Sequence, residues 1–280
     1  MTPLARLQSL LKRGYFPEGL PPPFKTDTFS KNAGMLTKLW GESRSLQETR
    51  YQRYSIPKAG GHRRLYAITN PISQFYLSRF ISNNWDGIQE YTDKSVFALD
   101  KIKFQQDTGR SVTLTDFAAL KIKKLKIASR NTAILQLDIS RFYPTLYTHS
   151  IPWALHGKEW CKKNYKLSSY KDTLGFKLDR LVRFTQENQT LGIPIGPDTS
   201  RILSEILAVA AELKFLEIYQ DSTIDGVRNY DDIFLGAPDA SVAEKYKSAF
   251  SQALNYYELE LNQDKTRITD SGQPLEKVWS

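Results

Sequence analysis

The sequence predicts an α+β protein in which an antiparallel sheet packs against helices, and three observations support this fold class. Short β-prone runs occur at 133–138, 224–235 and 266–269. Segments with helical periodicity separate these runs. A further stretch at 51–67 is predicted to form a two-stranded ribbon. This order of strands and helices is typical of a sheet covered by helices on one face.

The first fifty residues are predicted to contain two helices with an extended segment between them. Thr2 can cap a short amphipathic helix, which Gly14 then closes. Pro17 to Pro23 is expected to be extended, because its consecutive prolines lack amide donors. Residues 31–49 again show a helical pattern.

The middle of the chain gives a clear ribbon and a less clear helical region. The ribbon at 51–67 is predicted to turn at Gly60-Gly61, and a helix is predicted for 72–84. Further along, residues 121–126 (KIKKLK) carry four lysines in six positions. We interpret this run as a solvated helix face, with a patch that contacts a nucleic-acid backbone as the alternative.

The second half contains the strongest helical pattern, at 199–218, which Asp198 or Thr199 can cap. The run at 224–235 is predicted to be a β-hairpin folded at Tyr230-Asp231-Asp232. Further helices are predicted at 149–164, 170–188 and 240–257.

Composition restricts the classes of partner and setting. The chain has 280 residues, a formal charge of +9 and 12% aromatic residues, with a pI near 9.4. Such a surface suits a polyphosphate partner with bases that stack. The single Cys161 excludes an intramolecular disulfide and fits a reducing cytoplasm. We expect neither a secretory signal nor a membrane partner, because no run approaches about 18 apolar residues.

Aspartates stand at the edges of two apolar, β-prone runs. Asp138 ends the run at 133–138, and Asp231 and Asp232 lie in the predicted hairpin. Carboxylates beside Ile, Leu and Phe are costly to bury unless a cation meets them, and Mg²⁺ prefers hard oxygen ligands. Two such ions would support phosphoryl transfer, the chemistry of a nucleic-acid polymerase. A solvated hairpin tip is the alternative for the Asp231-Asp232 pair.

Five motifs occur in one order along the chain. They are 56–65 (IPKAGGHRRL), Asp138 with Phe142-Tyr143, 192–200 (GIPIGPDTS), 229–232 (NYDD) and 259–266 (LELNQDKT). Together they resemble the fingers and palm of reverse transcriptases, over about residues 50–270. The resemblance implies a right-hand polymerase whose thumb is absent or truncated, because the sequence stops soon after the last motif.

The same resemblance implies a division of the chain into parts. It assigns 1–50 to an N-terminal extension and the start of the fingers, and 51–132 to the fingers. It assigns 133–275 to the palm, with finger helices at about 149–195, and 276–280 to the start of a truncated primer-grip or thumb region.

A narrower resemblance is to the bacterial abortive-infection and defence-associated reverse transcriptases. It rests on 13–24 (RGYFPEGLPPPF), on 142–158 (FYPTLYTHSIPWALHGK) and on the Gly-Ile-Pro-Ile-Gly-Pro block. It implies a role in anti-phage defence, homo-oligomers, and DNA synthesis that is untemplated or primed on a protein hydroxyl. Its implied partners are dNTPs, DNA or RNA, and either a protein primer or an associated non-coding RNA.

The resemblance also assigns the metal ligands. Asp138 and Asp231 would be the main ligands of two Mg²⁺ ions, for which Mn²⁺ can substitute. Asp232 would contribute chiefly its charge, and the carbonyl group of Ile139 would complete one coordination shell. All three aspartates are the expected catalytic residues.

Nucleotide binding is implied for residues on both sides of the aspartates. In the ribbon, Lys58 and Arg64 are favoured as cations for a triphosphate, with Arg63 close behind. Tyr143 would exclude a ribose 2′-hydroxyl, and one residue of the Phe142-Tyr143 pair is expected to pack in the core instead. Two further positions complete the implied set, Gly196 beside the incoming base pair and Lys265 near the leaving pyrophosphate.

Two positions depart from the family pattern. Many reverse transcriptases have an aromatic residue where this chain has Asn229, and glutamine where it has Ile195. The loss of a polar group beside the templating pair favours untemplated synthesis. The alternatives are a templated enzyme like those of group II introns or retrons, and a nucleic-acid-binding module with a vestigial centre.

Overall fold

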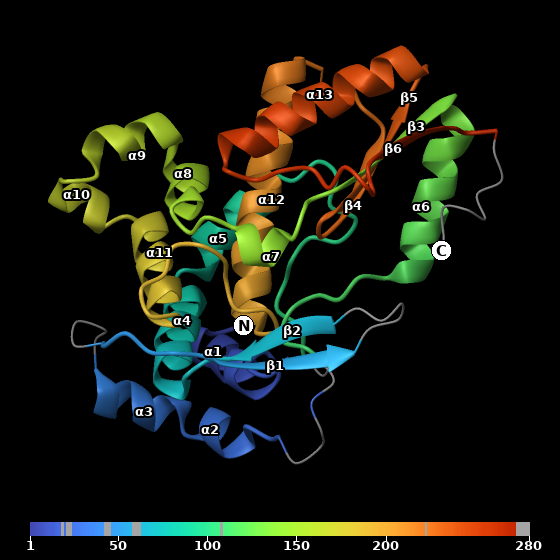
Figure 1. The fold of residues 1–280 in the computed structure, drawn as a ribbon. Coiled ribbons are helices and arrows are strands. Elements are labelled where there is room, and N and C mark those ends of the chain that lie inside the picture. The colour runs from blue at the N-terminus through green and yellow to red at the C-terminus, as the bar shows by residue number, and fades with distance from the viewer. Residues whose placement is uncertain are drawn as a thin grey trace. The chain divides into compact units, whose positions relative to one another are not determined.

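The computed structural model describes residues 1–17, 20, 24–41, 46–57, 63–106, 109–221 and 223–272. Its helices are α1 (Pro3–Lys12), α2 (Asp27–Lys31), α3 (Ala33–Trp40), α4 (Pro71–Asn83), α5 (Trp85–Thr92), α6 (Phe117–Arg130), α7 (Phe142–Thr145), α8 (Ser150–His156), α9 (Lys158–Asn164), α10 (Ser168–Lys171), α11 (Leu174–Phe184), α12 (Asp198–Tyr219) and α13 (Ala240–Tyr256). Its strands are β1 (Gln52–Pro57), β2 (Arg63–Ile68), β3 (Ala133–Asp138), β4 (Gly226–Asn229), β5 (Asp232–Ala237) and β6 (Arg267–Asp270) (Figure 1). The predicted α+β class, with antiparallel sheets packed on helices, is confirmed.

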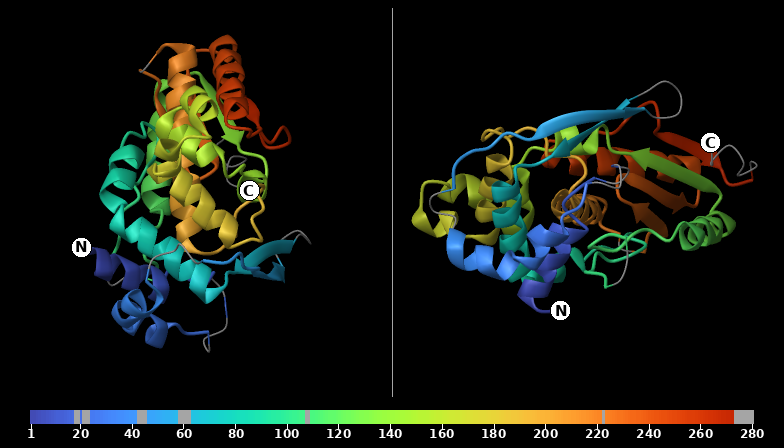
Figure 2. Two further views of the ribbon diagram at one scale, coloured as in Figure 1. Left: turned by 90° about the vertical axis from the view of Figure 1, so that its left-hand side faces the viewer. Right: turned by 90° about the horizontal axis from the view of Figure 1, so that it is seen from below.

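The chain forms two compact units. The first comprises Met1–Thr92, Ile102–Thr113 and Tyr143–Ile206. In it α1 packs on α4, α11 packs on both α4 and α8, and β1 pairs with β2 in the antiparallel ribbon drawn in light blue in Figure 2. The predicted Gly60-Gly61 turn lies outside the described residues, as does Lys58.

The second unit is built around a four-stranded antiparallel sheet. It comprises Asp93–Lys101, Leu114–Phe142 and the described residues from Leu207 onward. The strand order is β4-β5-β3-β6, so the last strand of the chain pairs with the first strand of this sheet. Helix α13 packs on the sheet through its contacts with β3, β5 and β6, whereas α6 packs on β4 and β5 (Figure 1).

The core between α6 and the sheet depends on the two-residue periodicity of the strands. Phe234 and Ile134 point from neighbouring strands toward α6, where they meet Leu120 and Ile127. Gly236 lies on the same face, and a Cβ atom there would stand 2.2 Å from the side chain of Asn131. The helix can therefore approach this end of the sheet closely.

Several predicted helices have different bounds, and the breaks have local causes. The helix predicted for 31–49 is confirmed only over α3, which ends at Trp40 before Gly41, whose φ of +60° is in the left-handed region, and 46–49 are irregular. The predicted helix at 149–164 is interrupted at Gly157, which has a φ of +86°. That at 170–188 begins later, as α11, where Thr173 caps the helix by accepting from the backbone N–H of Phe176.

The N-terminal helix begins as predicted, with the Thr2 hydroxyl accepting from the backbone N–H of Ala5. Gly14 lies two residues after the last residue of α1, at a position where neighbouring side chains leave no room for a Cβ atom. A Cβ atom there would lie 2.4 Å from the Ser111 hydroxyl. No helix in the described part of the chain is long and apolar enough to cross a membrane.

Candidate active site

Strand pairing brings two of the three predicted aspartates together. Asp138 ends β3 and Asp232 begins β5, and the two residues are direct partners in the antiparallel register. Directly opposed residues project from the same face of a sheet, with Cβ atoms about 5 Å apart. Phe234 follows Asp232 by two residues on β5, so its side chain projects from the same face of the sheet.

The third aspartate is supplied by the turn between β4 and β5. Tyr230 has a φ of +56°, which allows the tight reversal before Asp231. The carbonyl oxygen of Asp231 accepts from the backbone N–H of Ile139, at 3.2 Å. Ile139 is buried and also bridges to Leu261, so the main chain after Asp138 is held between two segments.

A buried ion pair between Arg228 and Glu212 supports the turn that carries Asp231. The Arg228 guanidinium, on β4, contacts the carboxylate of Glu212, on α12, and both side chains are almost fully buried. The same guanidinium donates to the carbonyl oxygen of Tyr230, at 3.1 Å. The second carboxylate oxygen of Glu212 accepts from the Ser95 hydroxyl at 2.6 Å and from the Val96 N–H at 3.0 Å. Through Arg228, the main chain of Tyr230, the residue before Asp231, is hydrogen-bonded to the buried core.

The surroundings of Asp231 and Asp232 favour the protonated forms of these two carboxylates. Burial, followed by the charges of its carboxylate neighbours, raises the pKa of Asp231 to about 6. Burial and the nearby charge of Asp138 also raise the pKa of Asp232, although this side chain stands at the more exposed rim. In both residues burial is the larger cause, and the repulsion between neighbouring carboxylates adds to it.

Two side chains from the segment before β6 meet Asp138. Lys265 forms an ion pair with one carboxylate oxygen, at 2.9 Å, and Asn262 donates to the other, at 3.0 Å. The hydrogen bond to Asp138 is the main reason that the pKa of Lys265 is raised. Within the second unit, the structure therefore brings the predicted nucleotide-binding residue Lys265 to Asp138.

The donor set has the chemistry that a divalent cation of the Mg²⁺ type requires. It offers three carboxylates, and burial together with their mutual repulsion raises the pKa values of Asp231 and Asp232. In the described residues no three His, Cys, Asp or Glu side chains are already arranged as a metal-ligand set. The ammonium group of Lys265 occupies an oxygen of Asp138 that such an ion would need.

Lys124 is a residue of this site that the sequence analysis did not single out. It lies on α6 above the ring of Phe234, 5.4 Å from its centroid, and its charge acts on Asp232. Burial lowers the pKa of Lys124. The interpretation of 121–126 as a solvated helix face holds for the exposed Lys121 and Lys126 but not for Lys124, which covers the sheet.

Of the other predicted residues that the structure describes, Arg63, Arg64, Tyr143 and Gly196 belong to the first unit, whereas Phe142 belongs to the second. Arg63 and Arg64 are adjacent on β2, so their side chains project from opposite faces. Arg63 donates to the backbone carbonyl of Ser55, at 3.1 Å, whereas the exposed Arg64 lies on the face of the stacked Tyr54 and Tyr66 rings. The two arginines therefore cannot serve the same face of the ribbon.

The glycine block lies directly beside this ribbon. The N–H of Ala67, on β2, donates to the carbonyl oxygen of Ile195, at 2.9 Å. Gly196 has a φ of +129°, and a Cβ atom there would stand 2.2 Å from Pro17. A glycine at 196 is thus required both by its backbone conformation and by the N-terminal segment that packs on it.

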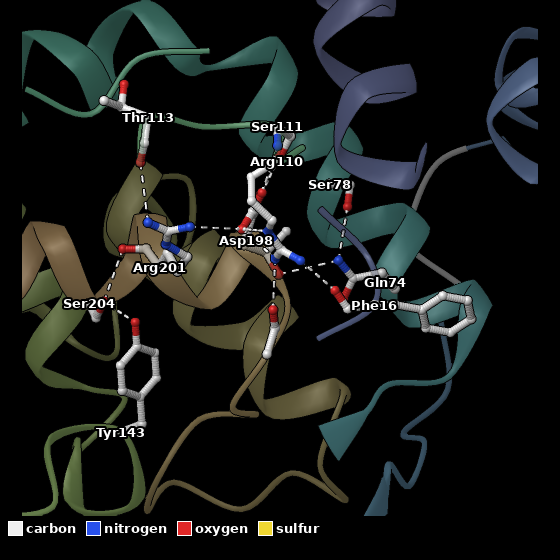
Figure 3. A network of polar contacts seen from close by, with 12 residues as sticks. Phe16, Gln74, Ser78, Arg110, Ser111, Thr113, Tyr143, Asp198, Arg201 and Ser204 are labelled. Carbon is white, nitrogen blue, oxygen red and sulfur yellow. Dashed lines mark hydrogen bonds and ion pairs between the residues drawn. The ribbon is translucent and has the colours of Figure 1, made fainter. Parts of the chain in front are cut away.

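A buried network fastens the same block to the N-terminal segment (Figure 3). Asp198 is fully buried and accepts from the Arg110 guanidinium at 3.0 Å and from the Ser111 N–H at 2.9 Å. Arg110 also donates to the carbonyl oxygens of Phe16 and Gly196, at 2.7 and 2.9 Å. The prediction that Asp198 caps the following helix is wrong, because Asp198 is the first residue of α12 and its carboxylate binds Arg110.

The two aromatic residues after Asp138 have different environments. Phe142 is buried, as expected for one member of the pair, while Tyr143 is partly exposed. The Tyr143 hydroxyl accepts from the Ser204 hydroxyl, at 3.1 Å (Figure 3). The backbone carbonyl oxygen of Tyr143 accepts from the Ile193 N–H. The Tyr143 side chain and the glycine block are thereby joined within one unit.

Comparisons with known proteins support the fold. No protein-family model and no curated protein matches the sequence. Among solved structures, telomerase from Candida tropicalis truncated from its C-terminal domain is 14% identical, with a TM-score of 0.52, over 90% of this chain and 56% of that one. Apo telomerase from Candida tropicalis is 13% identical, with a TM-score of 0.51, over 89% and 50%. Telomerase from Candida albicans with a telomeric RNA fragment is 12% identical, with a TM-score of 0.49, over 90% and 47%.

The two Candida tropicalis structures show that this chain has a reverse-transcriptase-like, palm-and-fingers fold. Their identities are low, so the likeness concerns the fold alone. The chain spans about half the length of these telomerases.

Proposed function

We propose that this protein is a reverse-transcriptase-type DNA polymerase that adds dNTPs to a 3′-hydroxyl. The observation that carries the proposal is the convergence of Asp138, Asp231 and Asp232 at one end of a sheet, within a reverse-transcriptase-like fold. Structural carboxylates are usually neutralised by cations of the protein. Here burial and mutual repulsion leave two carboxylates with raised pKa values, as expected where a cofactor supplies the charge.

The three carboxylates and the Ile139 carbonyl would hold two Mg²⁺ ions, with Mn²⁺ as a substitute. When bound, the ions supply activation of the attacking hydroxyl and neutralisation of the leaving oxygens. Lys265 pairs with one oxygen of Asp138 and Asn262 donates to the other, so both contacts would change if Asp138 held an ion through both oxygens. The ammonium group of Lys265 would then stand in the site as a proton donor for the departing pyrophosphate.

The first unit would bind the nucleotide. Arg64 is the preferred ribbon cation, because Arg63 is already engaged with Ser55. Gly196 presents main chain without a side chain to an incoming base pair. The Tyr143 ring, fixed through its hydroxyl by Ser204, would exclude the ribose 2′-hydroxyl and so select deoxynucleotides.

The finer proposal is a role in anti-phage defence, with synthesis that needs no template or starts from a protein hydroxyl. Its support is the sequence resemblance of 13–24 and 142–158 to defence-associated reverse transcriptases, together with Ile195 in place of a polar residue. A homo-oligomer and an associated RNA are part of the same proposal.

The test is incorporation of each labelled dNTP and rNTP by the purified protein with Mg²⁺. Each nucleotide is supplied with and without a primed RNA or DNA template, beside an Asp231→Ala/Asp232→Ala variant. Incorporation of dNTPs without template, lost in the variant, supports the full proposal. Synthesis only on primed RNA supports a templated reverse transcriptase. Binding of nucleic acid with no incorporation under any condition would favour the module with a vestigial centre and overturn the proposal.

A further inference from the structure

A second concave site lies within the first unit, between α4 and the segment formed by α10 and α11. The cavity has a volume of about 800 Å³. This is within the range of sites that enclose small organic ligands, and one nucleotide fits in it. Its lining includes four basic side chains and two phenylalanine rings, which are Arg79, Lys171, Lys177, Arg180, Phe80 and Phe176.

The lining has an excess of positive charge. Its four basic side chains are accompanied by one carboxylate, Asp172, which pairs with Lys177 at 3.4 Å. Two of the cations are held in place. Arg79 donates to the carbonyl oxygen of Gly41, and the Arg180 guanidinium lies 5.0 Å from the centroid of the Phe184 ring. Cations fixed in this way lose little freedom when an anion binds.

Aromatic rings adjoin these cations. Phe80 and Phe176 line the cavity and are both partly exposed, so each ring retains accessible surface. Phe176 is steadied by an edge-on contact with Tyr170, whose ring centroid is 5.2 Å away. The amide of Asn83 adds a polar group that can recognise a base edge or a phosphate.

We propose that this cavity binds a nucleotide of a single-stranded nucleic acid, with its phosphate between the lysines Lys171 and Lys177 and the fixed guanidinium groups of Arg79 and Arg180, and its base on Phe80 or Phe176. The combination of fixed cations with accessible rings is what single-strand binding requires, and it tolerates any base sequence. None of the lining residues belongs to the proposed catalytic or nucleotide-selecting set.

The choice of nucleic acid as ligand rests on the proposed function, but the test requires no catalysis. An oligothymidylate that contains 4-thiothymidine is cross-linked by light to the Asp231→Ala/Asp232→Ala protein, without metal or dNTP. Adducts are then located by peptide mass spectrometry. Adducts within 76–84 or 171–181 support the proposal. Adducts confined to other peptides overturn it, whether or not the wild-type protein polymerises dNTPs.

A charge-reversal pair tests the cations. In Lys171→Glu/Lys177→Glu, cross-linking at the cavity should be lost, and the salt slope of strand binding should fall by about 0.7, the contribution of the one phosphate that the two lysines contact. The matched control is Lys31→Glu/Lys245→Glu, which changes the charge equally at exposed residues that line no part of the cavity. Equal losses in both pairs would overturn the proposal, because general electrostatics would then explain the binding.

Substitution of Asp172, the carboxylate that lines the cavity, should strengthen strand binding where the lysine substitutions weaken it. Damage to the fold would not produce such an increase. Asp172 is exposed, so Asp172→Asn should fold normally. It removes a negative charge from the cavity and releases Lys177. Cross-linking at the cavity should increase, and competition by inorganic phosphate should remain weaker than competition by the unlabelled strand. Unchanged or decreased cross-linking, or equal competition by phosphate, would contradict the proposal.

Discussion

Replacement of Arg228 by methionine should separate the buried support of the aspartate turn from the aspartates themselves. Methionine retains much of the side-chain volume, but it leaves the Glu212 carboxylate buried without its cation. Removal of one partner from a buried ion pair typically costs about 3–5 kcal/mol. The Tyr230 carbonyl also loses its donor, which frees the residue before Asp231.

The matched variant is Arg228→Met/Glu212→Gln. Glutamine is neutral, and its side-chain oxygen can still accept from the Ser95 hydroxyl and the Val96 N–H. The double variant should therefore be destabilised by less than the sum of the two single variants, with a coupling free energy of about 2 kcal/mol or more. The free energies of unfolding are measured by urea titration followed by circular dichroism.

Additive effects of the two substitutions would refute this reasoning, because they would mean that the charges do not depend on each other. The double variant also tests the turn. It restores the charge balance of the core but not the hydrogen bond to Tyr230, so nucleotide incorporation should remain low after stability recovers. Full recovery of incorporation would show that the Arg228 contact does not position Asp231.

Three other predictions follow from the same contacts. Because the folded pKa of Asp231 is raised to about 6, stability without metal should be lost as pH rises through that value. Asp231→Asn should therefore stabilise the protein at pH 8 but not at pH 4 in urea titrations, by at most about 3 kcal/mol. Gly196→Ala should destabilise by about 1–3 kcal/mol through its backbone and the contact with Pro17, whereas Gly34→Ala, with open space around it, should be neutral or stabilising in thermal unfolding. Tyr143→Ala should increase rNTP use relative to dNTP use, measured as the ratio of kcat/KM values, and an unchanged ratio would contradict the selecting role.

Local chemistry made much of the second unit predictable. The strand that ends at Asp138 and the strands around Asp231 could be predicted because an alternation of apolar residues specifies a strand. The hairpin turn could be predicted because Tyr-Asp-Asp interrupts that alternation. The antiparallel pairing of those strands then places Asp138 opposite Asp232. Helix breaks at Gly41 and Gly157 were harder to read, because either glycine can also continue a helix at modest cost.

The buried polar partners could not be predicted, because they are far apart in sequence. Arg110 meets Asp198 across 88 positions, and Ser95 meets Glu212 across 117. A charged residue inside an apolar run, such as Glu212 on α12, signals that a partner exists without identifying it. Lys124 gave no signal of its own, since it stands among three similar lysines and only tertiary packing distinguishes it.

The most direct test of the account is dNTP incorporation with Mg²⁺ by Asp138→Asn and Asp231→Asn, compared with Asp239→Asn. The first two substitutions neutralise members of the carboxylate cluster with almost no change in volume, while Asp239 only caps α13. We predict that incorporation is abolished in the first two variants and retained in the third. Incorporation at the wild-type rate by Asp138→Asn or Asp231→Asn would contradict the assignment of this cluster as the polymerase centre.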